Sequence, residues 1–211
     1  MFKVLPEKNK VFFGILGVLG AFFVCFWGVK CYQVNARAYR QETEYYTMGD
    51  MVELDGNFFF DTNEKTEGYS VKVNAMELVD YADLFHEYDR EVSLPDNYPI
   101  AENAVLLNVT VKNTGNTDGY LPINGFAIYY GALQLPIDFE ILNMIDPQID
   151  GSTVLRLKTD SEVTLTLPFS PMPLDEAINS KKLNDVLKNE ELFLCVCEFP
   201  TRKNIILRKE K

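Results

Sequence analysis

The feature that most constrains this chain is an uncharged apolar run close to its N-terminus. Residues 11–29 have the sequence VFFGILGVLGAFFVCFWGV, which is 19 residues without a charged side chain. As an α-helix rising about 1.5 Å per residue, the run would be roughly 28 Å long and would match the hydrocarbon core of a bilayer. Twelve of its residues are Val, Ile, Leu or Phe, which together favour insertion by very roughly 4–7 kcal/mol. We therefore predict a single transmembrane anchor.

Two other fates of this segment are disfavoured by the sequence around it. The run is longer than the apolar part of a typical cleaved signal peptide, and the one small-x-small site, 36–38, lies well past Lys30. Neither Cys25 nor Cys31 follows a lipobox, which argues against a lipid anchor. Three basic residues lie on each side of the run, so the positive-inside count alone does not fix the orientation. We expect the short N-terminal tail inside the cell and the rest of the chain outside.

The remainder of the chain is strongly acidic and has the size of one domain. Residues 1–40 hold six of the 20 basic side chains and one of the 31 acidic ones, which leaves residues 41–211 with 14 basic, 30 acidic and a net charge of −16. Such a domain repels phosphate backbones, so we expect no nucleic-acid partner.

These features predict four segments along the chain. They are a cytoplasmic tail (1–10), a transmembrane anchor (11–29), a juxtamembrane stalk (30–50) and an extracellular domain (51–211).

The domain is predicted to be mainly β. Apolar and polar residues alternate in four stretches, which is the period of strands with one wet face. The stretches are 69–75, 105–112, 155–158 and 162–169. Strands with one solvent-exposed face are typical of antiparallel sheets. Turn residues such as Asp55-Gly56 and Asp150-Gly151 separate these strands. This pattern favours an antiparallel β-sandwich.

Helical patterns interrupt the strands at three places, before a closing strand at 192–199. Asp80 is a candidate N-cap for a helix over 81–88, whose apolar residues recur at i, i+3, i+4 and i+7. A second short helix is predicted near 137–145. A third, weaker one covers about 174–187.

The four cysteines show no disulfide pattern. Cys195 and Cys197 alternate along the closing strand, and residues spaced i, i+2 on a regular strand face the same way, which suits disulfide geometry poorly. We interpret both as small core residues.

The order of these motifs resembles a known but uncharacterised family. The segments LDGNFFF, EGYSVKVNAMELVDYADLFHEYD, VLLNVTVKNTGNTDGYLPI, LQLPIDFEILNMI and TVLRLKTDSEVTLTLPFS look like membrane-anchored surface proteins of Gram-positive gut bacteria. They also resemble immunoglobulin-like extracellular domains, a group that includes a secreted mycobacterial immunoprotective antigen. The resemblance covers roughly residues 50–207. It implies an immunoglobulin-like sandwich outside the cell and supplies no catalytic residues.

Motifs for catalysis, cofactors or metals are missing from the sequence. The single histidine, His86, lies in a charged stretch and is best interpreted as a surface residue, so a His-dependent hydrolase triad is improbable. The chain has no phosphate loop, GxSxG, HExxH or CxxC. Residues 114–119 resemble a calcium loop only in part, because the first donor is Thr and the expected Glu falls at Gly125. We predict a non-enzyme with no catalytic, cofactor-binding or metal-binding residues.

The most suggestive binding feature is a run of three aromatic residues, Phe58, Phe59 and Phe60. On a strand they must point to both faces, so one set leaves the core unless another part of the chain covers it. Both alternatives, intramolecular cover and a partner-binding patch, remain open. Tyr129-Tyr130 raises the same question. If the run forms a patch, Phe59→Ser should weaken partner capture without unfolding the domain.

Two functional hypotheses follow. The first is a membrane-anchored extracellular binding or accessory module, held in the lipid bilayer through residues 11–29 and contacting a surface or secreted protein. The second is a membrane-complex subunit or immunity-type protein that works through its transmembrane helix, in which a stripe of small residues (Gly17, Ala21, Cys25) could allow two helices to approach.

Overall fold

The N-terminal part of the chain is one long helix. The structure is a computed structural model that describes residues 7–36, 41–88, 103–146, 149, 152–170 and 180–208. The chain divides into two compact units, 1–40 and 41–211. In the first, helix α1 (Glu7–Ala36) contains the whole predicted anchor. Its segment Ile15–Ala36 is long and apolar enough to cross a membrane, and none of that segment is buried.

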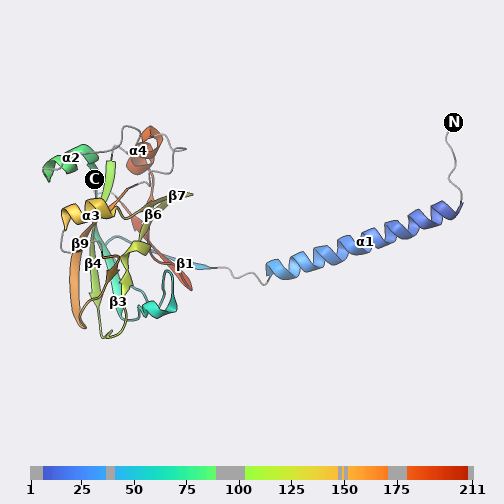
Figure 1. Cartoon of the computed structure of the whole chain (residues 1–211), viewed down its shortest axis with the longest axis horizontal. Coiled ribbons are helices and arrows are strands. Elements are labelled where there is room, and N and C mark those ends of the chain that lie inside the picture. The colour runs from blue at the N-terminus through green and yellow to red at the C-terminus, as the bar shows by residue number, and fades with distance from the viewer. Residues whose placement is uncertain are drawn as a thin grey trace. The chain divides into compact units, whose positions relative to one another are not determined.

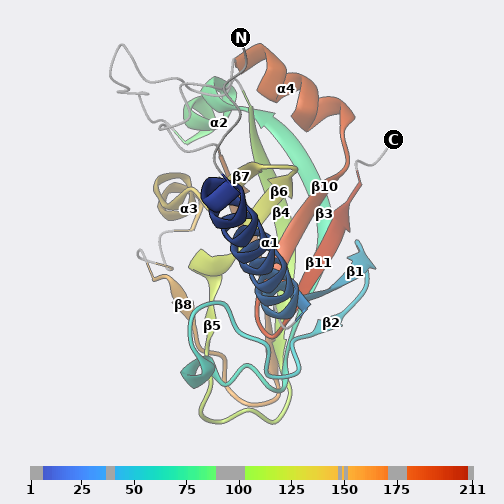
Figure 2. The ribbon, with the colours of Figure 1, turned by 90° about the vertical axis from the view of Figure 1, so that its right-hand side faces the viewer.

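The second unit is a β-sandwich built from two main sheets (Figures 1 and 2). The first sheet has five strands in the order β1 (Glu42–Thr47), β11 (Thr201–Leu207), β10 (Leu192–Cys197), β6 (Ala127–Tyr130) and β7 (Leu133–Pro136). The second has four strands in the order β2 (Val52–Glu53), β3 (Tyr69–Asp80), β4 (Asn103–Asn113) and β9 (Ser161–Phe169). A small two-stranded sheet pairs β5 (Leu121–Pro122) with β8 (Val154–Leu155). The prediction of a mainly β sandwich is confirmed.

The alternating residues of the sequence form the central ladder of the four-stranded sheet. Val71 is paired with Val111, which is paired in turn with Val163 on the next strand. Val109 lies one step along the same face, where it is fully buried. Because side chains alternate across a strand, residues that are paired across neighbouring strands point to the same face, so these apolar side chains face the interior together.

The core fills the space between the two sheets. Leu194 and Ile205 face inward from the five-stranded sheet, while Leu107 and Val109 face inward from the other, and all four are completely buried. Phe126 joins the same cluster just before β6. At about 25 cal/mol per Å² of apolar surface, this burial is the main stabilising contribution to the fold.

Short helices cover parts of the four-stranded sheet. Helix α2 (Tyr81–Glu87) packs on β3, and α3 (Phe139–Ile145) packs on β9. The predicted cap of α2 is present, and α3 has a cap that was not predicted. The backbone N–H of Asp83 donates to the Asp80 carboxylate at 3.2 Å, and Asp138 caps α3. Helix α4 (Ser180–Asn189) covers the second half of the third predicted helix, and residues 171–179 lie outside the described part of the chain.

The predicted stalk, residues 30–50, is shorter than expected at its C-terminal end. Helix α1 continues to Ala36, and the segment ETEYYT forms β1, an edge strand that pairs with β11. This pair is parallel, whereas the other named strand pairs are antiparallel. Five of the six β1 residues are exposed. An exposed edge strand does not require alternating apolar residues, so the residue pattern at this position does not indicate a strand.

Candidate functional site

The three consecutive phenylalanines divide between the core and the surface. Phe59 is only 8% exposed, and its ring centroid lies 5.8 Å from that of Phe126. The backbone of Gly125 lies against the same ring, where a Cβ atom would come within 2.4 Å of it. For Phe59 the alternative of intramolecular cover is therefore correct. The expectation that Phe59→Ser would spare the fold is wrong, because this ring is part of the hydrophobic core.

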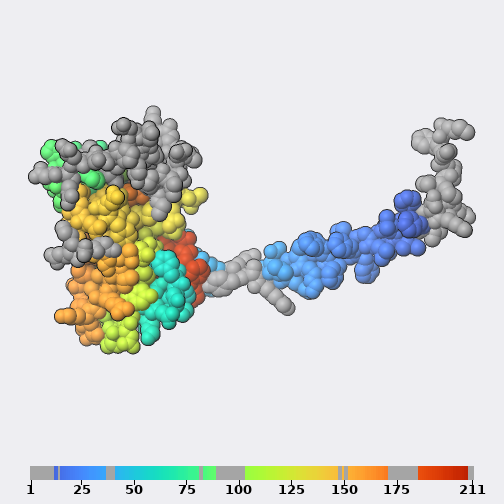
Figure 3. Space-filling model, in the orientation of Figure 1, coloured from blue at the N-terminus to red at the C-terminus, as the bar shows by residue number. Residues whose placement is uncertain are grey.

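Phe58 and Phe60 point away from that core. Phe60 is 65% exposed, and Phe58 is half-buried beside Phe199, which is 42% exposed. The Phe58 and Phe199 rings are 6.1 Å apart, and the two residues form an antiparallel bridge. In Figure 3 the loop between β2 and β3 (teal) and the strands β10–β11 (red) meet on the surface. We call Phe58, Phe60 and Phe199 the phenylalanine patch.

A buried carboxylate fixes the loop that presents this patch. Glu64 is almost fully buried, and its side chain accepts hydrogen bonds from three consecutive backbone N–H groups. These belong to Phe59 at 2.9 Å, Phe60 at 2.7 Å and Asp61 at 3.1 Å. Hydrogen bonds to an ionised group are stronger than neutral ones. The alternation of Phe59 inward and Phe60 outward is thus held by local polar contacts as well as by packing.

A second group of aromatic side chains lies on the outer face of the five-stranded sheet. Tyr129 is paired with Phe193 on the neighbouring strand. Tyr45, on the edge strand β1, makes an edge-to-face contact with Phe193 at 5.7 Å and is 59% exposed. The guanidinium of Arg202 lies 4.4 Å from the centre of the Tyr129 ring, a cation–π distance. We call Tyr45, Tyr129, Phe193 and Arg202 the aromatic sheet face.

The two predicted tyrosines take different positions. Tyr129 belongs to the aromatic sheet face, and its neighbour Tyr130 points the other way along the strand. Both are half-buried and contact the core cluster. Burial raises the pKa of Tyr129, with a further contribution from Cys195, so its hydroxyl stays protonated at neutral pH. The ring therefore offers a partner both an apolar body and a hydrogen-bonding tip.

The cysteines beneath this face are buried, free thiols. Cys195 is paired with Asn204 and Cys197 with Lys203, because the ladder shifts register between them. Adjacent residues of β11 face opposite sides, so the expectation that both cysteines point the same way is wrong: a bulge separates them. Burial raises the pKa of each thiol to about 12. They remain protonated and unreactive as nucleophiles at neutral pH.

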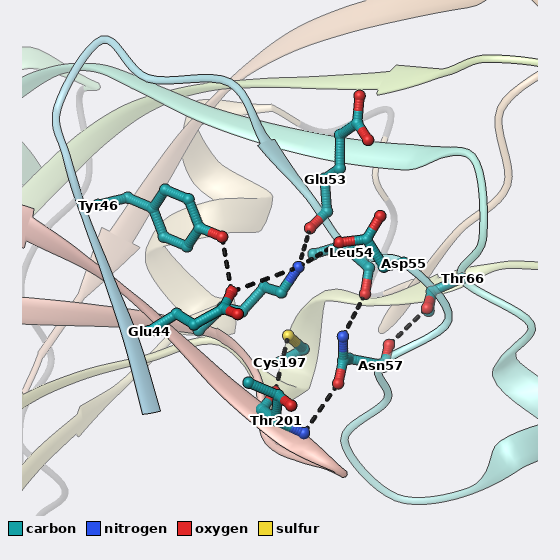
Figure 4. A network of polar contacts seen from close by, with 10 residues as sticks. Glu44, Tyr46, Glu53, Leu54, Asp55, Asn57, Thr66, Cys197 and Thr201 are labelled. Carbon is teal, nitrogen blue, oxygen red and sulfur yellow. Dashed lines mark hydrogen bonds and ion pairs between the residues drawn. The ribbon is translucent and has the colours of Figure 1, made fainter. Parts of the chain in front are cut away.

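A network of charges connects the edge strand β1 to both sheets (Figure 4). The ammonium of the buried Lys203 donates to the backbone carbonyl of Glu53 at 2.6 Å and to the Asp55 carboxylate. The Glu44 carboxylate lies 3.7 Å away and accepts a hydrogen bond from Tyr46 at 2.7 Å. Because carboxylates compensate the ammonium, this arrangement fits a structural ion cluster better than a catalytic amine.

The described residues show no arrangement typical of a catalytic or metal-binding site. Among them, no group of three or more His, Cys, Asp or Glu side chains is arranged to hold a metal ion. His86 is exposed on α2. The candidate sites are instead two surfaces, the phenylalanine patch and the aromatic sheet face, and both are suited to contact with other molecules.

Residues 43–203 match the family described as "Domain of unknown function (DUF5028)". The chain belongs to this family. The DUF5028 match covers β1 except its first residue and nearly the whole of the second unit. The family boundary is therefore close to the structural one and differs from the boundary at 51 expected from sequence. Helix α1 precedes the match. The resemblance to an uncharacterised family is thereby confirmed, and its description assigns no activity to the domain.

Two other comparisons complete this picture. No match was found among curated proteins. Among solved structures, the yjhA protein from Bacillus subtilis is 10% identical, with a TM-score of 0.39, over 77% of this chain and 99% of that one.

Sequence reasoning missed several residues that build the DUF5028 surface. Tyr45 lay in the presumed stalk, and Phe193 read as an ordinary member of an apolar strand. Phe199 and Arg202 are distant from the phenylalanine run and from Tyr129 in sequence, and only the fold brings them together. The Tyr45-Tyr46 doublet was the one signal that could have suggested an exposed aromatic position.

Proposed function

We propose that this protein is a non-enzymatic binding or accessory module, tethered to the cell membrane by α1 and contacting a protein partner through the aromatic sheet face. The observation that carries the proposal is the exposure of Tyr45 against Phe193 and the stacked Arg202–Tyr129 pair on one sheet face. Tyrosine and arginine are enriched in the energetic centres of protein interfaces. A partner with a basic surface suits a domain of net charge −16, since complementary charge accelerates association.

The strand order supports an immunoglobulin-like sandwich. Seven strands, β3, β4, β6, β7, β9, β10 and β11, can be numbered one to seven in chain order. The first, second and fifth then lie in one sheet, while the third, fourth, sixth and seventh lie in the other. Immunoglobulin constant domains likewise group their strands A, B and E against C, F and G, but their fourth strand, D, lies with the first group, whereas here the fourth strand lies with the second. In this proposal the domain is extracellular, on a Gram-positive cell, with the N-terminal tail inside.

Site-specific photo-crosslinking in intact cells tests the binding face. A benzophenone amino acid placed at Tyr45 should form one discrete adduct with a partner protein, and the same group at the exposed Tyr88, just after α2, should not. Tyr45→Ala should weaken co-purification of the partner so identified, while Tyr88→Ala leaves it unchanged. Equal crosslinking from both positions would refute a dedicated binding face.

Protease treatment tests the orientation. Protease added to whole cells should digest the domain. Protection in whole cells combined with digestion after permeabilisation would place the domain inside and refute the proposed topology.

A second candidate function rests on the helix rather than the sandwich. All described apolar side chains of α1 are exposed within this chain, so a membrane partner could cover them, with Gly17, Ala21 and Cys25 permitting close approach. Replacing residues 11–29 with an unrelated anchor separates the two functions. Loss of activity would favour the membrane-complex subunit, whereas retention favours the extracellular module.

A further inference from the structure

The phenylalanine patch lies where the chain enters the folded domain. Gln41 is the first described residue of the second unit, and its side-chain amide donates a hydrogen bond to the backbone carbonyl of Glu198. Phe199 is the next residue, and its backbone is bridged to Phe58. The exposed rings are therefore grouped around the attachment point of the tether.

The length of chain between the helix and this point is short. Four residues, 37–40, separate Ala36 from Gln41. A fully extended chain spans at most about 3.3–3.6 Å per residue, so these two positions can be no more than about 18 Å apart. The helix itself remains apolar enough to span a membrane up to Ala36. With that span the attachment point lies within about 18 Å of the bilayer surface. With the span at residues 11–29, helix residues 30–36 add about 10 Å, which keeps the attachment point within roughly 30 Å of that surface.

The chemistry of the patch suits the boundary between lipid headgroups and acyl chains. Its three rings carry no polar atom, and Phe60 and Phe199 expose large parts of theirs. Glu64 and the Phe58–Phe199 bridge hold the backbone that carries them, so little conformational entropy is lost when the rings are buried. Aromatic side chains concentrate at this depth in membranes, where they bury apolar surface.

We propose that the phenylalanine patch inserts into the outer boundary of the same bilayer that holds α1, and so restrains the domain at the membrane. This inference rests on the membrane tether of the proposed function and adds a second, lateral contact to it. The aromatic sheet face is a separate set of residues and remains free for a protein partner.

The charge of the domain sets the lipid preference of this contact. The nearest described charges include Glu198, which is paired with Arg202 at 3.7 Å, and the domain as a whole is strongly acidic. Anionic headgroups would repel the domain, while the free energy gained by inserting the rings is the same for any lipid. Insertion should therefore be deeper in phosphatidylcholine than in phosphatidylglycerol, and salt should reduce the difference.

Quenching by brominated phosphatidylcholine tests the proposal on the full-length chain in vesicles. The native Trp27 is the chain's one tryptophan and reports anchor insertion in the unaltered protein. In a Trp27→Phe background, Phe60→Trp and Phe199→Trp each place one indole in the patch. Tyr88→Trp is the matched control, because Tyr88 is also exposed but follows α2, at the opposite end of β3 from the loop that carries Phe60 (Figure 2). Far-UV circular dichroism checks the fold of each variant.

The expected result is strong quenching and a blue shift for F60W and F199W, with neither change for Y88W. Quenching of Trp27 in the unaltered chain without quenching of F60W and F199W would overturn the inference and leave the tether intact. Equal quenching of Y88W would also overturn it, because the contact would then not be specific to the patch. An unquenched Trp27 would overturn the tether itself, and the inference with it.

Discussion

A single added methyl group at Gly125 tests whether Phe59 belongs to the core. In Gly125→Ala the new Cβ would lie 2.4, 2.6 and 2.8 Å from three ring carbons of Phe59, whereas carbon atoms normally stay about 3.5–4.0 Å apart. The ring cannot retreat freely, because the fully buried Phe126 packs against it. Overpacking of this kind costs about 1–3 kcal/mol.

A smaller opposing effect comes from the unfolded chain. Alanine has less backbone freedom than glycine, which stabilises the folded state by about 0.4–1 kcal/mol where the backbone conformation is compatible. The net expected loss is therefore about 1–2 kcal/mol. For a domain of this size that corresponds to a fall in Tm of roughly 2–8 °C. Thermal and urea unfolding of the full-length chain in detergent would measure it.

A double-mutant cycle identifies the clash as the cause. Phe59→Ala alone should cost about 3–5 kcal/mol, as expected for a buried phenylalanine. In that background Gly125→Ala should cost almost nothing, because the ring it would strike is gone. An unchanged Tm for Gly125→Ala, or the same loss with and without Phe59, would refute the placement of this ring.

Three further predictions concern buried polar groups and thiols. Lys203→Met should destabilise the domain by about 1–3 kcal/mol in urea unfolding, since it removes the charged hydrogen bonds that connect β11 to the β2 end; a variant as stable as the parent would refute that role. Burial, reinforced by the hydrogen bond from its hydroxyl to Glu44, raises the pKa of Tyr46 to about 12, so the folded state keeps a proton that the unfolded chain releases near pH 10. Stability should therefore be lost as pH rises from about 10 toward 12, and Tyr46→Phe should lose less over that range; equal losses would contradict the assignment. In native protein, maleimide at neutral pH should modify Cys31 and leave Cys195 and Cys197 unmodified until denaturant is added, as mass spectrometry would detect; rapid labelling of either would show that burial does not protect them.

The strands that alternate strongly could be predicted because local pattern and burial agree there. Val71, Val111 and Val163 belong to three separate alternating stretches, and the fold aligns them in one row. The short helix α2 could be predicted for a similar reason, since its cap, Asp80, is a local signal that needs no tertiary contact.

The binding surfaces could be predicted only in part, because their members come from distant parts of the chain. Phe58 and Phe60 were visible as a run, but their division from Phe59 depends on Glu64 and Gly125, which no periodicity reveals. Lys203 offered no signal either: its partner Asp55 is 148 positions away. Such long-range pairing is decided by the fold as a whole.

The parallel edge strand has a practical consequence for anyone who wishes to study the domain without its helix. A soluble fragment begun at residue 51 would lack β1, and with it Glu44 and Tyr46. The whole length of β11 would then become an unpaired edge, open to association with other copies. A fragment begun at Gln41 keeps that edge covered. The ten residues 41–50 therefore determine whether the fragment stays monomeric or tends to aggregate.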